Sequence, residues 1–146
     1  MFEKLSNKKM AYASEKFDTL IGRTTTIQGN LILLESVRID GKVVGNIVAD
    51  QSGKITVAIG PMGEVVGDIS AHRIMVAGKV TGHIYASERV EFQKDAVVHG
   101  DISYGSISVE HGANISGLVL QINATDQSAA GAQTAIHNAQ ALKDGS

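Results

Sequence analysis

A short pattern of aliphatic and polar positions recurs six times between residues 25 and 119. In each copy one aliphatic residue lies two positions before a central glycine and another lies two positions after it. A spacing of two is the period of a β-strand, in which alternate side chains point to opposite faces. The pattern therefore predicts short strands with a shared buried face, in copies centred on Gly29, Gly45, Gly67, Gly82, Gly100 and Gly117.

The spacing between the copies predicts how these strands are arranged. Successive central glycines are 16, 22, 15, 18 and 17 residues apart, which leaves no room for a crossover helix between strands. Strands repeated in this way are expected to stack as the coils of a parallel β-helix. We therefore predict an all-β fold, a single-stranded right-handed parallel β-helix of about six triangular coils, with the handedness taken from the general crossover rule.

A second aliphatic pair completes each coil of the predicted core. The central glycine is expected at an inward corner position that either has no space for a Cβ atom or needs a positive φ. The 22-residue spacing contains an insertion at residues 50–54, whose turn-forming residues predict a protruding loop. The second pairs are Val37/Ile39, Val57/Ile59, Ile74/Val76, Val90/Phe92 and Ile107/Val109.

Composition and charge exclude several other classes of protein. A length of 146 residues predicts one domain, and the lack of cysteine excludes a disulfide scaffold and a cysteine zinc site. A net charge of −2 provides no basic surface for DNA or RNA, so no nucleic-acid partner is expected. The longest aliphatic run, residues 31–34, is far shorter than the roughly 20 residues of a membrane span. We also expect no secretory signal peptide.

The two ends of the chain lie outside the repeat. Three regions are predicted: a flexible tail at 1–16, the β-helix at 17–120, and a disordered tail at 121–146 with at most a transient helix over 135–142. The first residues form an amphipathic, basic segment of the kind that binds an anionic membrane surface, with an ordinary solvated terminus as the alternative. The residues expected at the membrane are Met1, Phe2, Lys4, Leu5, Lys8 and Lys9.

The ends of the β-helix are predicted to be contact surfaces between subunits. A β-helix exposes unpaired strand edges and a slice of its apolar core at each end, and the sequence shows no capping helix. Leu118 also replaces the polar residue that follows the central glycine in the other five copies. The alternative is that the C-terminal tail covers the last coil. The predicted contact residues are Leu20, Ile21, Ile27 and Leu31 in the first coil, and Ile107, Val109, Ile115, Leu118, Val119 and Leu120 in the last.

Several phrases of the sequence resemble a known family, the bactofilins, which are bacterial cytoskeletal proteins. They are residues 19–22 (TLIG), 37–47 (VRIDGKVVGNI), 59–60 (IG) and 98–102 (VHGDI), and the opening MFEK is similar to the family's membrane-targeting peptide. The resemblance covers roughly residues 17–120. It implies a right-handed triangular β-helix that assembles end to end into non-polar filaments without nucleotide, metal or other cofactor. It also implies a scaffold at the cytoplasmic face of the bacterial membrane, which organises cell shape and positions its partners, cell-wall enzymes or other scaffold proteins.

Two other classes of function stay open from the residues alone. A trimeric β-helix enzyme of the hexapeptide acyltransferase or γ-class carbonic anhydrase type would place histidines between its subunits. A zinc site needs three ligands that converge at about 2 Å, and the histidines here occupy different positions in the repeat, so we expect no enzyme. An adhesive or ice-binding β-helix would need a threonine ladder, but Thr24, Thr25 and Thr26 cluster in one coil. The histidines are His72, His83, His99, His111 and His137.

One column of polar residues is predicted along the stack. Asp68, His83 and Asp101 each follow a central glycine, so they are expected on consecutive coils about 4.8 Å apart. Carboxylates on both sides of a histidine favour its charged form and would tie assembly to pH. The alternative is that polar residues simply favour this corner.

Overall fold

The computed structural model describes residues 17–122, and this part of the chain consists of fifteen β-strands and no helix. The strands are short and are joined by tight turns. In chain order they are β1 (Thr19–Ile21), β2 (Thr26–Gln28), β3 (Leu31–Leu33), β4 (Val37–Ile39), β5 (Lys42–Val44), β6 (Ile47–Ala49), β7 (Thr56–Ile59), β8 (Glu64–Val66), β9 (Ile69–Val76), β10 (Lys79–Thr81), β11 (Ile84–Phe92), β12 (Val97–His99), β13 (Ile102–Val109), β14 (Asn114–Ser116) and β15 (Val119–Gln121).

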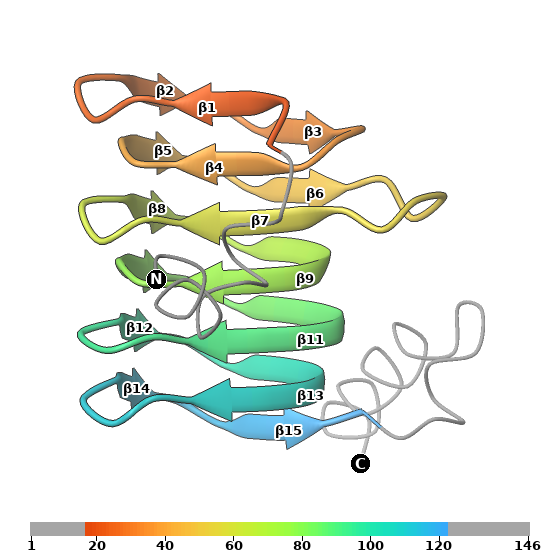
Figure 1. Ribbon diagram of the computed structural model, residues 1–146, viewed down its shortest axis with the longest axis vertical. Helices are drawn as coiled ribbons and strands as arrows, with labels where there is room; N and C mark the ends of the chain where they lie inside the picture. The colour runs from red at the N-terminus through yellow and green to blue at the C-terminus, as the bar shows by residue number, and fades with distance from the viewer. Residues whose placement is uncertain (1–16, 123–146) are drawn as a thin grey trace, which may run out of the picture.

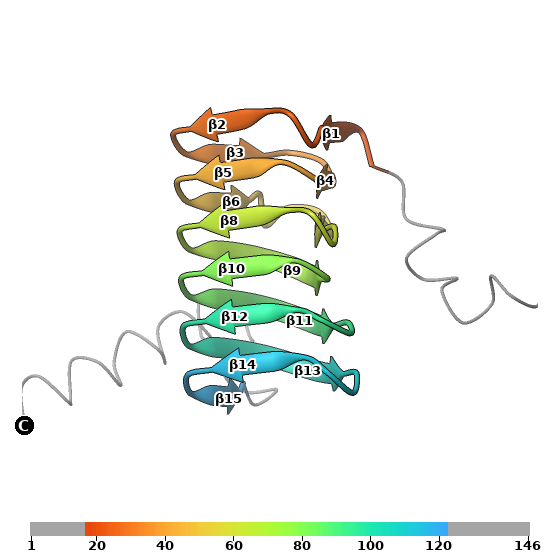
Figure 2. The same ribbon diagram turned by 90° about the vertical axis from the view of Figure 1, so that its left-hand side faces the viewer.

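The strands wind into a stack of coils in which every pairing is parallel (Figure 1). The side face of the stack is a six-stranded sheet, β2-β5-β8-β10-β12-β14, with one strand from each coil (Figure 2). The front face holds β1, β4, β7 and the second halves of β9, β11 and β13. The back face holds β3, β6, the first halves of those three long strands, and β15. The predicted β-helix of about six triangular coils is thus confirmed.

The core is built from the positions that the repeat marks as apolar. In the interior coils the residues two before and two after the central glycine are buried, as Val80 and Ile84 show with exposures of 0% and 1%. The second aliphatic pair of each interior coil is equally buried, and Phe92 is the largest side chain among them. Stacked columns of valine and isoleucine therefore form one continuous core along the stack.

Two constraints require glycine at the centre of each repeat, and both were expected from the sequence. Gly82 has a φ of 149°, a conformation that is essentially restricted to glycine. A Cβ atom there would also collide with the carbonyl oxygen of Gly67, the corresponding glycine one coil earlier. The same collision would occur in each following coil, so this corner of the β-helix accommodates only glycine.

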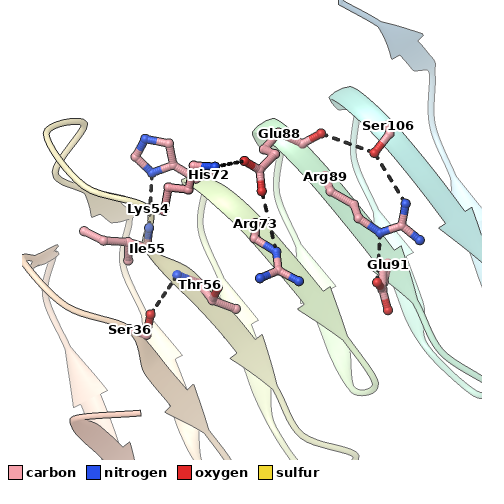
Figure 3. Close-up of polar contacts among 10 residues, drawn as sticks. All are labelled: Ser36, Lys54, Ile55, Thr56, His72, Arg73, Glu88, Arg89, Glu91 and Ser106. Atoms are coloured by element: carbon pink, nitrogen blue, oxygen red, sulfur yellow. Dashed lines mark hydrogen bonds and ion pairs between the residues drawn. The ribbon is translucent and has the colours of Figure 1, made fainter. Parts of the chain in front are cut away.

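The insertion after β6 forms the protruding loop that the sequence predicts (Figure 1). Polar contacts fasten the end of the loop to the coils that follow it (Figure 3). The Ile55 N–H donates to Nδ1 of His72 at 3.3 Å, and Lys54 lies 3.2 Å from the Glu88 carboxylate. Within the loop, the hydroxyl and backbone N–H of Ser52 donate to Asp50 and lower the pKa of its carboxyl group.

The described part of the chain continues slightly past the end expected for the β-helix. Strand β15 includes Gln121, and Ile122 is buried at 6% exposure while its N–H donates to the Tyr104 carbonyl at 2.7 Å. The tail predicted at 1–16, the part of the predicted 121–146 tail that follows Ile122, the membrane residues from Met1 to Lys9 and the transient helix at 135–142 lie outside the described residues. Between residues 17 and 122 no helix is long and apolar enough to span a membrane.

Candidate polymerisation surfaces

Each end of the β-helix leaves three strands with one unpaired edge. At the N-terminal end β1, β2 and β3 each pair with a single strand, in the next coil. At the C-terminal end β14 and β15 do the same, and the second half of β13 pairs only with β11. Backbone N–H and C=O groups at such edges are ready to pair with another chain.

The N-terminal end exposes part of the apolar core, but the four predicted contact residues do not form a single surface. Ile27 and Leu31 are half-buried at the open end and pack against the core. Ile21 points inward and is already buried at 6% exposure. Leu20 is paired with Arg38 in the strand register, points outward on the front face, and is 67% exposed.

The C-terminal end exposes a larger part of the core. Val119 occupies the same inward position as Ile102 one coil earlier, yet Val119 is 45% exposed and Ile102 only 1%. Val109 and Phe92 show the same contrast, with exposures of 50% and 1%. The other predicted contact residues at this end are Ile107 and Ile115, which are half-buried, and Leu118 and Leu120, which are exposed.

The sequence analysis missed Tyr104 at this end of the core. Tyr104 is half-buried against the core, in an inward position that Ala86 and Ala71 occupy in the two preceding coils. The sequence contains a signal for this inward position, because each of these residues lies two positions after the aliphatic residue that follows the central glycine. The alternation therefore extends one step further than the sequence analysis took it, and the large residue appears where the stack ends.

Side chains that follow the central glycines form a ladder of hydrogen bonds up one corner, which we call the polar ladder. Each side chain accepts a hydrogen bond from the backbone N–H of the corresponding residue in the next coil. The bonds run from Asn46 to Asn30 Oδ1 (2.9 Å), from Asp68 to Asn46 Oδ1 (3.0 Å), from His83 to Asp68 Oδ1 (2.9 Å), from Asp101 to His83 Nδ1 (3.0 Å) and from Leu118 to Asp101 Oδ1 (3.0 Å).

The polar ladder confirms that Asp68, His83 and Asp101 share one column, and it explains their polarity. Each supplies an acceptor to a backbone N–H that the strand pairing leaves free at this corner. His83 accepts at Nδ1, so its neutral ring carries the proton on Nε2. The ladder has a direction: it begins at Asn30, whose N–H has no earlier coil within residues 17–122, and it stops at Leu118, which offers no acceptor.

The histidines of the described residues do not converge. His72 contacts the inserted loop, His83 belongs to the polar ladder, His99 is exposed on the side face and His111 lies in a turn after β13. Over residues 17–122, no group of three or more histidine, cysteine or acidic side chains is placed to hold a metal ion. His137 lies outside the described residues.

Comparisons with known proteins agree with a polymer-forming role. Residues 19–119 match the family model described as "Bactofilin: Polymer-forming cytoskeletal". The chain is 35% identical to Bactofilin BacO of Myxococcus xanthus (strain DK1622) over 105 residues, which cover 66% of this chain and 83% of BacO. It is 28% identical to Bactofilin BacP of the same organism over 112 residues, 77% of this chain and 45% of BacP.

A solved structure supports the same assignment. The bactofilin of Thermus thermophilus, reconstructed by cryo-EM as double helical filaments, matches with a TM-score of 0.62 and 26% identity. The match covers 71% of this chain and 99% of that one. Membership of a polymer-forming cytoskeletal family makes the chain a structural protein and not an enzyme. From its repeat, its fold and these comparisons, the chain belongs to the bactofilin family of polymer-forming cytoskeletal proteins.

Proposed function

We propose that the subunits join end to end through their terminal coils, without nucleotide or metal, into filaments that pair as those of the Thermus relative do. The observation that carries this proposal is the exposure of core positions at the ends, above all Val119 at 45% against 1% for Ile102. Stacking a second subunit there covers these side chains and provides partners for the strand edges. The binding energy comes from burial of apolar surface and needs no bound cofactor.

The direction of the polar ladder favours contacts between like ends. A head-to-tail contact would place the free N–H of Asn30 against Leu118, which offers no acceptor. A buried donor without a partner costs about 1–3 kcal/mol. A contact between two C-terminal ends instead places apolar Leu118 against its counterpart. A contact between two N-terminal ends brings together two Asn30 residues, whose carboxamides both donate and accept. We therefore propose a non-polar filament.

Single-cysteine variants test this arrangement, because the natural chain contains no cysteine. Gln28→Cys places a thiol on the first strand of the side face and Ser116→Cys places one on the last. A bismaleimide of roughly 10 Å reach, about two coil spacings, would join thiols across a junction. The proposal predicts that each variant cross-links to itself, whereas Thr81→Cys in a middle coil does not.

Two results would overturn parts of this proposal. Cross-linking only in a mixture of the Gln28→Cys and Ser116→Cys chains would show head-to-tail stacking and remove the non-polar arrangement. Uncross-linked monomers in every sample, at concentrations where filaments are expected, would remove end-to-end assembly altogether.

We further propose that the filament lies on the cytoplasmic face of the bacterial membrane, where it organises cell shape and positions cell-wall enzymes. Support comes from the basic, amphipathic start of the sequence, with Phe2 and Leu5 beside Lys4, Lys8 and Lys9. A basic residue near an anionic surface contributes about 1 kcal/mol, so one subunit binds weakly and a filament with many copies binds firmly.

Vesicle co-sedimentation tests the membrane proposal. Full-length filaments are expected to pellet with vesicles that contain anionic phosphatidylglycerol and much less with pure phosphatidylcholine. The double variant Phe2→Ser, Leu5→Ser should still form filaments and lose this binding. Wild-type filaments that ignore both kinds of vesicle would contradict the membrane location and leave the polymer itself unaffected.

A further inference from the structure

The outward row of the back face is apolar at its N-terminal end, where a polar surface is expected. Ile32 and Val48 are partners in the strand register and both point away from the core. The next three positions of the row are Ser70, Tyr85 and Ser103. The first two coils thus differ from the middle of the same row.

Three aliphatic side chains make up this region, which we call the lateral patch: Ile32, Leu34 and Val48. Their exposures are 80%, 73% and 48%. Leu33, which lies between Ile32 and Leu34, and Ala49, which follows Val48, are buried and point inward. The three side chains of the lateral patch therefore point outward from the side of the stack. A contact through the open ends of the β-helix therefore leaves the lateral patch uncovered. A set of neighbouring exposed aliphatic residues typically marks a binding surface.

The charges around the lateral patch favour a protein partner over an anionic lipid surface. Strands β3 and β6 contain no basic residue, and the charged residues next to the patch in the chain are Glu35 and Asp50. Asp50 is held at this corner because its N–H donates to the Leu33 carbonyl at 2.8 Å. Carboxylates at the rim would be repelled by a negatively charged membrane.

We infer that the lateral patch is the contact between two strands of the filament, with a second copy of this chain as its occupant. This inference rests on the proposed function, which has end-to-end strands that pair as the Thermus filaments do. Two strands that wind around each other must touch along their sides, and the lateral patch is a cluster of exposed aliphatic residues on one side. If like ends meet, the four coils that carry the patches of two subunits span three coil spacings, about 15 Å along the filament axis, at every N-terminal junction.

The small area of the lateral patch determines when the contact between two strands forms. Three aliphatic side chains cover only a fraction of the roughly 1,600 Å² that a standard stable interface buries. Two free subunits therefore do not associate through it. Along a filament the contact recurs at every N-terminal junction, and such repetition raises the total affinity far above that of one contact. Pairing of strands accordingly follows polymerisation and depends on it.

The test compares the wild type with three full-length variants by cryo-EM and by mass per unit length. Val48→Lys introduces a charge into the lateral patch, and Ile32→Lys, Val48→Lys disrupts it more fully. Val44→Lys is the matched control, because Val44 is an outward valine of the same coil, 37% exposed, on the side face. We expect paired strands in the wild type and the control, and single strands of half the mass per unit length in both patch variants.

Each contrary result has a distinct meaning. Single strands in the wild type, or paired strands in the patch variants, would overturn the lateral contact while end-to-end assembly stands. Loss of all filaments in Val48→Lys but not in Val44→Lys would assign the patch to the end contact and overturn the inference. Patch variants that stay paired but lose binding to phosphatidylglycerol vesicles would make the occupant a lipid surface. Absence of filaments in the wild type would overturn the proposed function itself.

Discussion

The interior and terminal coils of this β-helix follow the same sequence pattern and differ in what covers them. In an interior coil the inward residues Val80 and Ile84 are buried, and both edges of every strand are paired. In the last coil the equivalent residues Ile115 and Val119 are half-buried and 45% exposed, and their strands have one free edge. The terminal coil therefore lacks only its neighbour, which a second subunit supplies in the proposed end-to-end filament.

This comparison shows how a stack of identical units becomes a polymer. Stability within the subunit comes from contacts between adjacent coils, and each added coil repeats the same burial and pairing. In the proposed end-to-end filament, the same contacts formed between two subunits extend the stack. The chemistry of the end residues then decides which ends meet, and at the last coil Leu118 takes the place of a hydrogen-bonding side chain.

The largest expected effect comes from filling the glycine corner of an interior coil. Gly82→Ala places a Cβ atom against the Gly67 carbonyl oxygen at a φ of 149°. Backbone strain of about 1–3 kcal/mol and a similar cost of overpacking add to about 2–6 kcal/mol. This is a large part of the 5–15 kcal/mol stability of a typical domain. Urea unfolding followed by circular dichroism measures it, with Gly53→Ala in the open loop as the neutral control.

A smaller effect is expected from the equivalent glycine of the first coil. Gly29 has a φ of 137°, but a Cβ atom there meets nothing within 4 Å, because no coil precedes it among residues 17–122. Gly29→Ala should therefore cost only the strain, about 1–3 kcal/mol, and leave a folded subunit. Equal destabilisation by Gly29→Ala and Gly82→Ala in urea would show that coil contact contributes nothing, which contradicts the comparison.

Removal of one acceptor from the polar ladder is expected to have the smallest effect on folding. Asp68→Ala takes away the partner of the His83 N–H, which donates at 2.9 Å in an exposed position. Water replaces part of this bond, so the loss should be about 0.5–1.5 kcal/mol in the free energy of unfolding. Asp68→Asn keeps the acceptor oxygen and serves as the control. A loss as large for Asn as for Ala would show that the negative charge, and not the hydrogen bond, stabilises this corner.

The fold could be predicted largely from the sequence, because a period of two and a recurring glycine leave few arrangements. The run Leu31 to Leu34 shows where this reasoning stopped short. Leu31 lies at the inward position two residues after Gly29, so alternation also places Leu33 inward and Ile32 outward, as the register with β6 and the burial of Leu33 show. The alternation was not extended to these residues in the sequence, so the lateral patch was missed.

The end surfaces were only partly predictable for a similar reason. Repeat position indicates whether a side chain points inward, but exposure depends on what lies above and below it. Ile21 is buried and Leu20 points outward, so neither forms the open end in the way that Ile27 does. The bonds of the polar ladder depend on backbone N–H positions in the next coil, which the spacing of residues does not show.

Negative-stain electron microscopy of the wild type beside the Leu118→Arg, Val119→Arg variant tests the central claim most directly, with neither nucleotide nor metal added. Both sites lie in the exposed last coil, so the variant subunit should fold with an unchanged circular dichroism spectrum. The account predicts long filaments for the wild type and small oligomers for the variant. Filaments of equal length from both chains, or uniform monomers or trimers from both, would contradict assembly through the terminal coils.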